Sequence, residues 1–256
     1  MGQNHIIQGL WIGGRLSAMQ RLSIRSFLAN GHEYHLYVYG DVAGVPPGTV
    51  LKDARQILPA SAVFRNRDFD TFAAFSDFFR YRLLLENGGC WSDLDVVCLK
   101  RFDFQAEYVF SAQHCPDETT TETVTTAVIK TPKGAAILDY AWKTCCSKDP
   151  LQLAWTEVGP DLLRDAVAKY GLSQYVRTAA TFCPVPWYRW YQVLNPLASS
   201  GFGEDTYAVH LWHEMWRRQG MDTDASHSPD CTYETLKRRF LAKTGEINEG
   251  ADRRVV

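Results

Sequence analysis

Apolar positions follow two alternating patterns along the chain, one typical of strands and the other typical of helices. Short apolar segments bounded by glycine, proline or asparagine predict strands, whereas an apolar position every three or four residues predicts a helix. The predicted strands are His5–Trp11, Tyr34–Tyr39, Cys90–Leu99, Tyr108–Ala112 and Val124–Ile129. The predicted helices are Ser17–Asn30, Thr71–Asn87, Gly134–Cys146, Pro160–Tyr170 and Tyr233–Leu241. This alternation is typical of an α/β fold.

Two parts of the chain lack a clear period. From Phe182 to Trp216 aromatic residues and prolines are frequent, and we expect loops that wrap a site. After Met221 the composition becomes polar and charged. The sequence therefore predicts one large domain over residues 1–220 and a polar, partly helical C-terminal extension over residues 221–256.

Composition narrows the range of functions. The 256 residues are 46% hydrophobic and carry a net charge of −2, so a large core is expected and a basic surface for nucleic acid is not. The seven cysteines are odd in number and show no CxxC spacing, which argues against a zinc site or a disulfide framework and favours a cytoplasmic setting. Because no signal peptide and no run of about 18 apolar residues is present, we expect a soluble protein that can associate peripherally with the inner face of a membrane.

The segment from Ala74 to Lys100 carries the strongest chemical signal. A helical run ends at two glycines and is followed by Asp93 and Asp95 on a predicted strand, where alternate side chains point the same way. Two acids in an apolar strand are costly without a cation. Their oxygens can hold a hard divalent ion that still has coordination sites for a diphosphate. We therefore expect a metal-dependent enzyme that acts on a nucleotide-activated substrate.

The helix before the two aspartates contains a second polar pair. Asp77 and Arg80 lie at positions i and i+3 of a helix that is apolar around most of its circumference. One interpretation is a structural ion pair between the two side chains. The other is a carboxylate and a guanidinium that line a sugar or phosphate pocket beside the metal.

The same residues resemble a known family. The string SDFFRYRLLLENGGCWSDLDV resembles the signature of the DXD-containing, sugar-binding-region glycosyltransferases of family 32, which are similar in their core to the clostridial glucosylating toxins. The segments IIQGLWIGG, LKDARQILP, EVGPDLL and AVHLWHEMW resemble other parts of this family, so the similarity touches most of residues 5–216. The resemblance implies a GT-A fold with a mixed central sheet flanked by helices.

The resemblance also implies an activity. Such an enzyme uses Mn²⁺ or Mg²⁺ and moves a sugar from a nucleotide donor, UDP-sugar in this case, to a glycan or lipid-linked acceptor with retention at the anomeric carbon. The implied product is a surface glycan such as capsular polysaccharide or lipopolysaccharide. Retention can proceed by front-face attack or by double displacement, for which Asp77 and Glu157 are the carboxylates considered.

Site residues follow from the resemblance one by one. Asp95 is expected to bind the metal directly, and Asp93 is expected to contact the ribose or the metal through water. His210 is expected to be a late metal ligand or phosphate contact, and an imidazole ligand would favour Mn²⁺ over Mg²⁺. By the same resemblance, Trp11 stacks on uracil, Asp77 and Arg80 hold hydroxyls of the donor sugar, and Trp216 covers the diphosphate.

Departures and rival functions are also visible in the sequence. His213, Glu214 and Met215 replace small residues and a serine before the last tryptophan, which alters the expected lid. Asp93-Leu94-Asp95-Val96-Val97 also fits the DxDx[TV] motif of phosphatases, but the required apolar strand before the motif and a later acidic pair are missing. A non-catalytic nucleotide-sugar-binding relative is the other alternative, and the retained acids and Arg80 argue against it.

Overall fold

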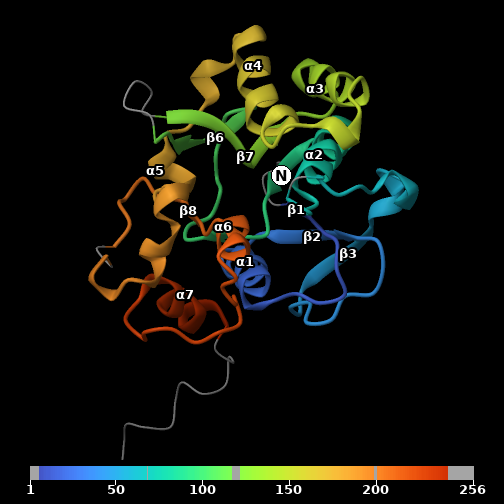
Figure 1. Ribbon diagram of the computed structural model, residues 1–256. Coiled ribbons are helices and arrows are strands. Elements are labelled where there is room, and N and C mark those ends of the chain that lie inside the picture. Colours follow the sequence, from blue (N-terminus) through green and yellow to red (C-terminus); the bar gives the residue numbers. More distant parts are fainter. Residues whose placement is uncertain (1–5, 68, 117–121, 199–200, 242–256) are drawn as a thin grey trace, which may run out of the picture.

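The computed structural model describes residues 6–67, 69–116, 122–198 and 201–241. Its centre is a six-stranded sheet with the strand order β3-β2-β1-β4-β7-β6 (Figure 1). The strands are β1 (Ile6–Trp11), β2 (Glu33–Val38), β3 (Thr49–Asp53), β4 (Gly89–Ser92), β6 (Val109–His114) and β7 (Glu122–Thr131). Strands β1 to β4 are parallel, whereas β7 is antiparallel to both of its neighbours. This sheet confirms the predicted α/β fold class with a mixed central sheet flanked by helices, as expected of a GT-A fold.

Helices cover both faces of this sheet. The α-helices in the described residues are α1 (Ala18–Ala29), α2 (Ala73–Asn87), α3 (Ala136–Cys146), α4 (Leu162–Lys169), α5 (Ala179–Phe182), α6 (His213–Arg218) and α7 (Thr232–Leu241). Helices α2, α3 and α4 lie on one side of the sheet, and α1 and α7 lie on the other (Figure 1). A second sheet of two strands, β5 (Val96–Cys98) and β8 (Ala208–His210), lies beside α1. Within the described ranges no helix is long and apolar enough to span a membrane.

The central strands divide their side chains between two cores because neighbouring strand residues point to opposite faces. Tyr37 and Trp91 contact the core around α2 and α3, whereas their neighbours Leu36 and Cys90 contact the core around α1. Helix α2 is buried along most of its length, as its apolar circumference predicted. The sheet is therefore fully covered near its centre, and its strand ends are the part of the sheet that can form a site.

The strand order marks where that site lies. The chain forms β1, β2 and β3 in turn and then returns to the other side of β1 to form β4. In open α/β sheets ligands bind beyond the carboxyl ends of the strands at such a switch point. Gln8 of β1 is paired with Trp91 of β4, so Trp11 and Asp93 both lie at this end of the sheet. The fold thus brings the end of β1 next to the acidic motif.

The acidic motif itself lies on a turn, and the prediction of a single strand from Cys90 to Leu99 is wrong. Strand β4 ends at Ser92, and the N–H of Val96 donates to the carbonyl of Asp93 at 3.2 Å, which closes the turn. Strand β5 then leaves the central sheet and pairs with β8. The carboxylates of Asp93 and Asp95 therefore converge through a turn between two sheets and not through strand alternation.

Other differences from the prediction concern short or exposed elements. Strand β3 was missed because it is an edge strand with partly exposed residues and no clear alternation. Strand β8 and helix α6 begin within the segment predicted as loops, and both are too short to show a period. Helix α4 begins at Leu162 and directly follows a π-helical segment, Glu157–Asp161, whose one residue with non-helical backbone angles is Gly159, so the chain is helical from Pro160 as predicted.

Helix α1 begins with a complete cap. Ser17 is the N-cap and forms the capping box with Gln20, as the predicted helix start requires. A second acceptor comes from far along the chain, because Oδ1 of Asp224 accepts the N–H of Ala18 at 2.6 Å. The same carboxylate lies 3.3 Å from a guanidinium nitrogen of Arg15. The carboxylate thus occupies the positive end of the helix dipole.

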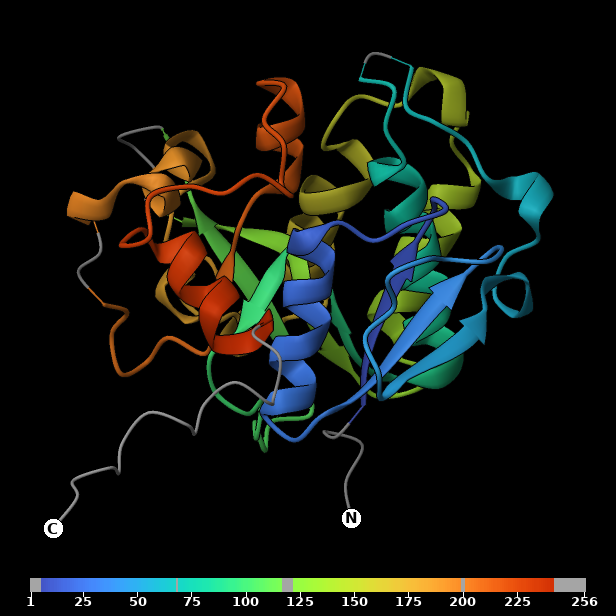
Figure 2. The same cartoon turned by 90° about the horizontal axis from the view of Figure 1, so that it is seen from below.

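Helix α7 packs beside α1 and extends this contact (Figure 2). Tyr233 and Phe240 of α7 are buried, and the Tyr233 hydroxyl donates to the carbonyl of Thr223 at 2.7 Å. The final predicted helix is thus present as α7, and its buried side chains pack into a hydrophobic core together with residues from earlier in the chain. The predicted domain boundary between residues 220 and 221 stays a prediction, and residues 242–256 lie outside the described part.

Replacing Asp224 by alanine should destabilise the protein by about 1 kcal/mol, because the Ala18 N–H loses its acceptor and the helix dipole loses a charge. Asp224→Asn keeps an accepting oxygen and should lose less stability. The free energy of unfolding in urea measures both, with Asp41→Ala at an exposed position as the control. If Asp224→Ala is as stable as the control, the cap does not contribute.

Candidate active site

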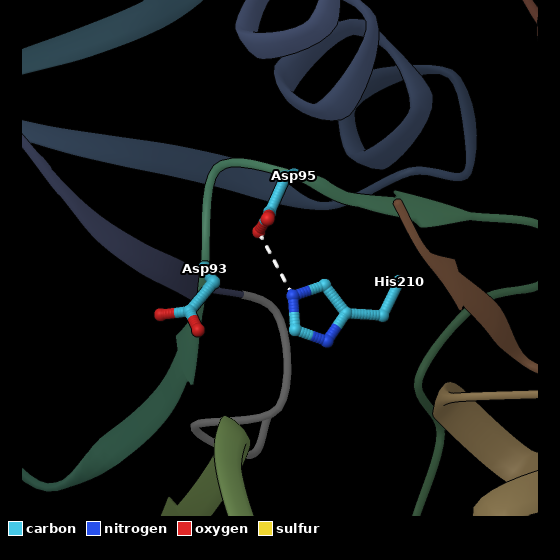
Figure 3. A group of neighbouring side chains, drawn as sticks. All are labelled: Asp93, Asp95 and His210. Carbon is cyan, nitrogen blue, oxygen red and sulfur yellow. Dashed lines mark ion pairs between the residues drawn. The ribbon is translucent and has the colours of Figure 1, made fainter. Parts of the chain in front are cut away.

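Asp95 lies on the turn between β4 and β5, and its carboxylate faces His210 of β8 (Figure 3). Its Oδ1 is 3.2 Å from Nε2 of His210, and its Oδ2 accepts the backbone N–H of His213 at 2.7 Å. The carbonyl of Asp95 also accepts the N–H of Leu211 at 2.8 Å. Trp212 has the left-handed backbone conformation, with φ of 57°, which turns the chain so that the following N–H faces the carboxylate. The carboxylate of Asp95 is thus held from two directions by one short segment.

Asp93 is held by different residues. Its Oδ1 accepts the indole N–H of Trp91 at 2.9 Å and lies 3.1 Å from a guanidinium nitrogen of Arg80. Arg80 in turn lies over the Trp91 ring at 4.8 Å from the ring centroid. The side chain of Asp93 is 25% exposed, against 13% for Asp95, so Asp93 forms the more open side of the pair. Trp91 and Arg80 both contact the same oxygen, Oδ1.

Burial and charge set the pKa values of these groups. Burial alone would raise the pKa of Asp95, but the imidazole of His210 and the N–H of His213 hold it below its usual range. Burial would lower the pKa of His210, and the carboxylate of Asp95 raises it well above its usual value instead. Burial raises the pKa of Asp93, which Arg80 opposes. The carboxylate of Asp95 is therefore the more firmly ionised of the two.

Asp93, Asp95 and His210 fit a divalent cation. Each of the three offers one ligand atom, and these atoms lie within 4.8 Å of one another. Ligand atoms on one small ion lie no more than roughly 4.2 Å apart, so the three side chains would have to draw together to hold it. Two carboxylate oxygens with one imidazole nitrogen suit Mn²⁺. The predicted metal ligands are therefore brought together, and their coordination of a metal stays a prediction.

Arg80 is held almost entirely by the protein. Besides Asp93, its guanidinium donates to the carbonyl of Ser76 at 3.2 Å, to the hydroxyl of Ser76 at 3.0 Å and to the carbonyl of Thr126 at 2.6 Å. Its Nε lies 3.3 Å from Oδ1 of Asp77. The ion pair of the first interpretation is thus present, and Arg80 also reaches the acidic motif. The contact of Arg80 with a donor sugar stays a prediction.

Asp77 lies in a closed space against Gly159. A Cβ at Gly159 would come within 2.6 Å of Oδ2 of Asp77, so only glycine leaves room for the carboxylate. Tyr81 ties the same backbone to α2 by donating to the carbonyl of Gly159 at 3.1 Å. Burial raises the pKa of Asp77 to about 6, although Arg80 opposes the shift. Its predicted role toward the donor sugar is likewise untested.

The two predicted tryptophans differ in their surroundings. Trp11 is partly buried at the end of β1, and its ring lies against Gly13, where a Cβ would meet Nε1 at 3.1 Å. Trp216 is completely buried and donates from Nε1 to the carbonyl of Leu211 at 2.8 Å. In this arrangement Trp216 supports the segment that holds Asp95. The stacking of Trp11 on uracil and the contact of Trp216 with a diphosphate stay predictions.

Some residues of the site were not singled out from the sequence. Trp91 could have been found, because it precedes Asp93 by two residues and so shares its side of the chain. The N–H of His213 and the thiol of Cys183 have no local sequence signal, since their roles depend on contacts across more than one element. Glu157, considered as a nucleophile, lies 2.8 Å from Lys148 and outside the metal-ligand group.

Comparisons with known proteins agree with the position of the motif. Residues 28–114 match the family model described as "Glycosyltransferase sugar-binding region containing DXD motif", which includes α2 and the acidic turn. No curated protein matches the chain. The solved structure "PaToxG Glycosyltransferase" is similar with a TM-score of 0.48 and 17% identity, over 93% of this chain and 85% of that one. A transferase mutant with two cysteine-to-serine changes is similar with a TM-score of 0.45 and 11% identity, over 68% of this chain and 87% of that one.

Gly159→Ala should destabilise the protein by about 1 to 3 kcal/mol, because the added Cβ collides with the carboxylate of Asp77. In an Asp77→Ala background the space is free, so the same change should cost little. Urea unfolding of the two single variants and the double variant measures this coupling. An equal cost of Gly159→Ala in both backgrounds would contradict the proposed contact.

The stability of the protein should depend on pH through Asp77. Because the folded state raises the pKa of Asp77 to about 6, its contribution is fully present below about pH 4 and is lost as the pH rises through 6. Relative to Asp77→Asn, the wild type should lose roughly 2 to 3 kcal/mol between pH 4 and pH 7.5. The measurement is urea unfolding of both proteins at both pH values.

The exposed Asp103→Asn is the matched control for the loss of an acid and should follow the wild type. The groups that interact with Asp77 include Arg80, Asp93, Tyr81, Cys145 and Thr126, and all of them are retained in Asp77→Asn. The same pH dependence in the wild type and in Asp77→Asn would rule out Asp77 as its source.

Proposed function

We propose that this protein is a metal-dependent glycosyltransferase that moves a sugar from a nucleotide-diphosphate donor, UDP-sugar in the first instance, to a hydroxyl acceptor. The observation that carries the proposal is the convergence of Asp93, Asp95 and His210 at the switch point of the sheet. The match of residues 28–114 to a DXD sugar-binding region supports the same class of enzyme. Together they favour a catalytic protein over a non-catalytic sugar-binding relative.

The side chains at this site have different proposed roles. A divalent ion bound there supplies charge stabilisation for the leaving diphosphate. Asp95 and His210 offer it one oxygen and one nitrogen, and Asp93 offers a second oxygen from the more open side. Arg80 fixes Asp93 and adds a buried positive charge beside the three candidate metal ligands. A diphosphate is a good leaving group once its charge is stabilised, so no general acid is required.

The remaining features of the proposal rest on the resemblance and on the position of Trp11. Trp11 ends the strand next to β4 and can present its ring to a uracil base. Retention at the anomeric carbon, Mn²⁺ as the preferred ion and a glycan or lipid-linked acceptor complete the proposal. The expected pathway is the synthesis of capsular polysaccharide or lipopolysaccharide on the cytoplasmic side of a membrane.

Asp95→Asn should lower Mn²⁺-dependent release of UDP from a UDP-sugar by about 100-fold or more, because the amide replaces the more firmly ionised carboxylate of the site. The assay is UDP release with Mn²⁺ and with a chelator, after a thermal-shift screen of nucleotide sugars has identified the donor that stabilises the protein most. Asp103→Asn, at an exposed position outside the site, is the control.

The results distinguish the metal-dependent transferase from the alternatives. Unchanged turnover in Asp95→Asn would refute the metal mechanism. Stabilisation of the wild type by a nucleotide sugar and Mn²⁺ without any UDP release would favour the non-catalytic relative.

A further inference from the structure

The two ring nitrogens of His210 face different surroundings. Nε2 lies 3.2 Å from Oδ1 of Asp95, and Nδ1 lies 3.7 Å from Sγ of Cys183. Figure 3 shows one nitrogen directed to the aspartates and the other directed away from them. His210 itself is 6% exposed and Cys183 is fully buried, so water has little access to either contact. The sulfur atom is therefore the group that determines what Nδ1 can do.

Cys183 is placed firmly enough to act on the ring. It follows α5, and its N–H donates to the carbonyl of Ala179 at 2.7 Å. Two residues later, the carbonyl of Val185 accepts the indole N–H of Trp212 at 2.7 Å. The Trp212 ring lies against the His210 ring with a centroid distance of 3.8 Å and an angle of 33° between the planes. The segment after α5 thus fixes His210 both at its edge and across its face.

The thiol is unsuited to chemistry of its own. Cys183 is fully buried within an apolar core cluster, where a cysteine is inert toward substrates. The Cys183 thiol can still accept or donate one weak hydrogen bond.

We infer that Cys183 is a positioning residue for the metal ligand His210: its sulfur accepts the proton of Nδ1, so that Nε2, which gives up its own proton when a cation binds, is the nitrogen that faces Asp95. This inference rests on the proposed function. A histidine that binds a metal usually donates its other N–H to an acceptor, which fixes both tautomer and ring orientation. Here the acceptor is the sulfur, and Trp212 prevents the ring from turning.

The opposite arrangement makes an opposite prediction. If the thiol donated its proton to Nδ1, Nε2 would carry the ring proton and would point it at Asp95. In that case Nδ1 would have no proton to keep when Nε2 gives up its own, and removal of the thiol would leave metal affinity unchanged or improve it. The effect of a Cys183 variant on metal binding therefore decides between the two arrangements.

The experiment measures the Mn²⁺ dissociation constant of the full chain by electron paramagnetic resonance, without donor or turnover. Cys183→Ala should bind Mn²⁺ about 10- to 100-fold more weakly than the wild type. Cys183→Ser offers a hydroxyl oxygen at the same position and should recover most of the affinity. Cys98→Ala removes another fully buried thiol, from strand β5 outside the ligand group, and should bind like the wild type.

A second measurement does not depend on how well a variant folds. Nitrogen-15 NMR of the histidines in the wild type saturated with Zn²⁺, a diamagnetic ion that binds imidazole, reports the tautomer, and the His210 signal is assigned by its absence in His210→Gln. We expect the proton on Nδ1. A proton on Nε2, or wild-type Mn²⁺ affinity in Cys183→Ala, would overturn the inference.

The two proposals fail in different ways. If the wild type binds no Mn²⁺, the proposed function fails and this inference fails with it. If the wild type binds Mn²⁺ and Cys183→Ala binds it equally well, the role of Cys183 alone is refuted.

Discussion

The structure depends on how two neighbouring carboxylates are compensated in a space largely closed to solvent. Asp93 and Asp95 repel each other, and water cannot fully screen that repulsion. Each acid has a separate partner, Arg80 for Asp93 and His210 for Asp95. Arg80 comes from α2 and His210 from β8, so these contacts tie the acidic turn to a helix that covers the central sheet and to a strand of the second sheet. The turn can hold its shape because its charges are anchored on both sides.

The topology explains why this turn lies where a ligand can reach it. The parallel strands β1 and β4 end at the switch point, and the chain leaves the central sheet there to form β5. A continuous strand would have carried Asp95 along the sheet and away from Trp11. The turn instead directs both carboxylates to the open end of the sheet, while Gly159 allows Asp77 to pack behind Arg80 without closing that end.

Local patterns were sufficient for much of the fold and insufficient for the geometry of the site. The start of α1 at Ser17 and the burial of α2 follow from residues close together in sequence. The acidic turn does not, because it forms only when Val96 pairs with His210, more than a hundred residues later. The spacing of Asp77 and Arg80 predicted their contact, but nothing in it indicated that the same guanidinium would also hold Asp93. The sequence could therefore identify the residues of the site more readily than their partners.

The partners of the two acids differ in what they can do. A guanidinium has only donors, so Arg80 can compensate Asp93 but can never bind a cation beside it. An imidazole has one donor and one acceptor in its neutral form, so His210 can either compensate Asp95 or bind a cation together with it. The first contact therefore stays the same whether or not an ion is bound, and only the second can change its nature. Because of this difference, Asp95 and His210 form the side of the site where an ion can replace an existing contact. Asp93 can bind the same ion while it keeps its contact with Arg80.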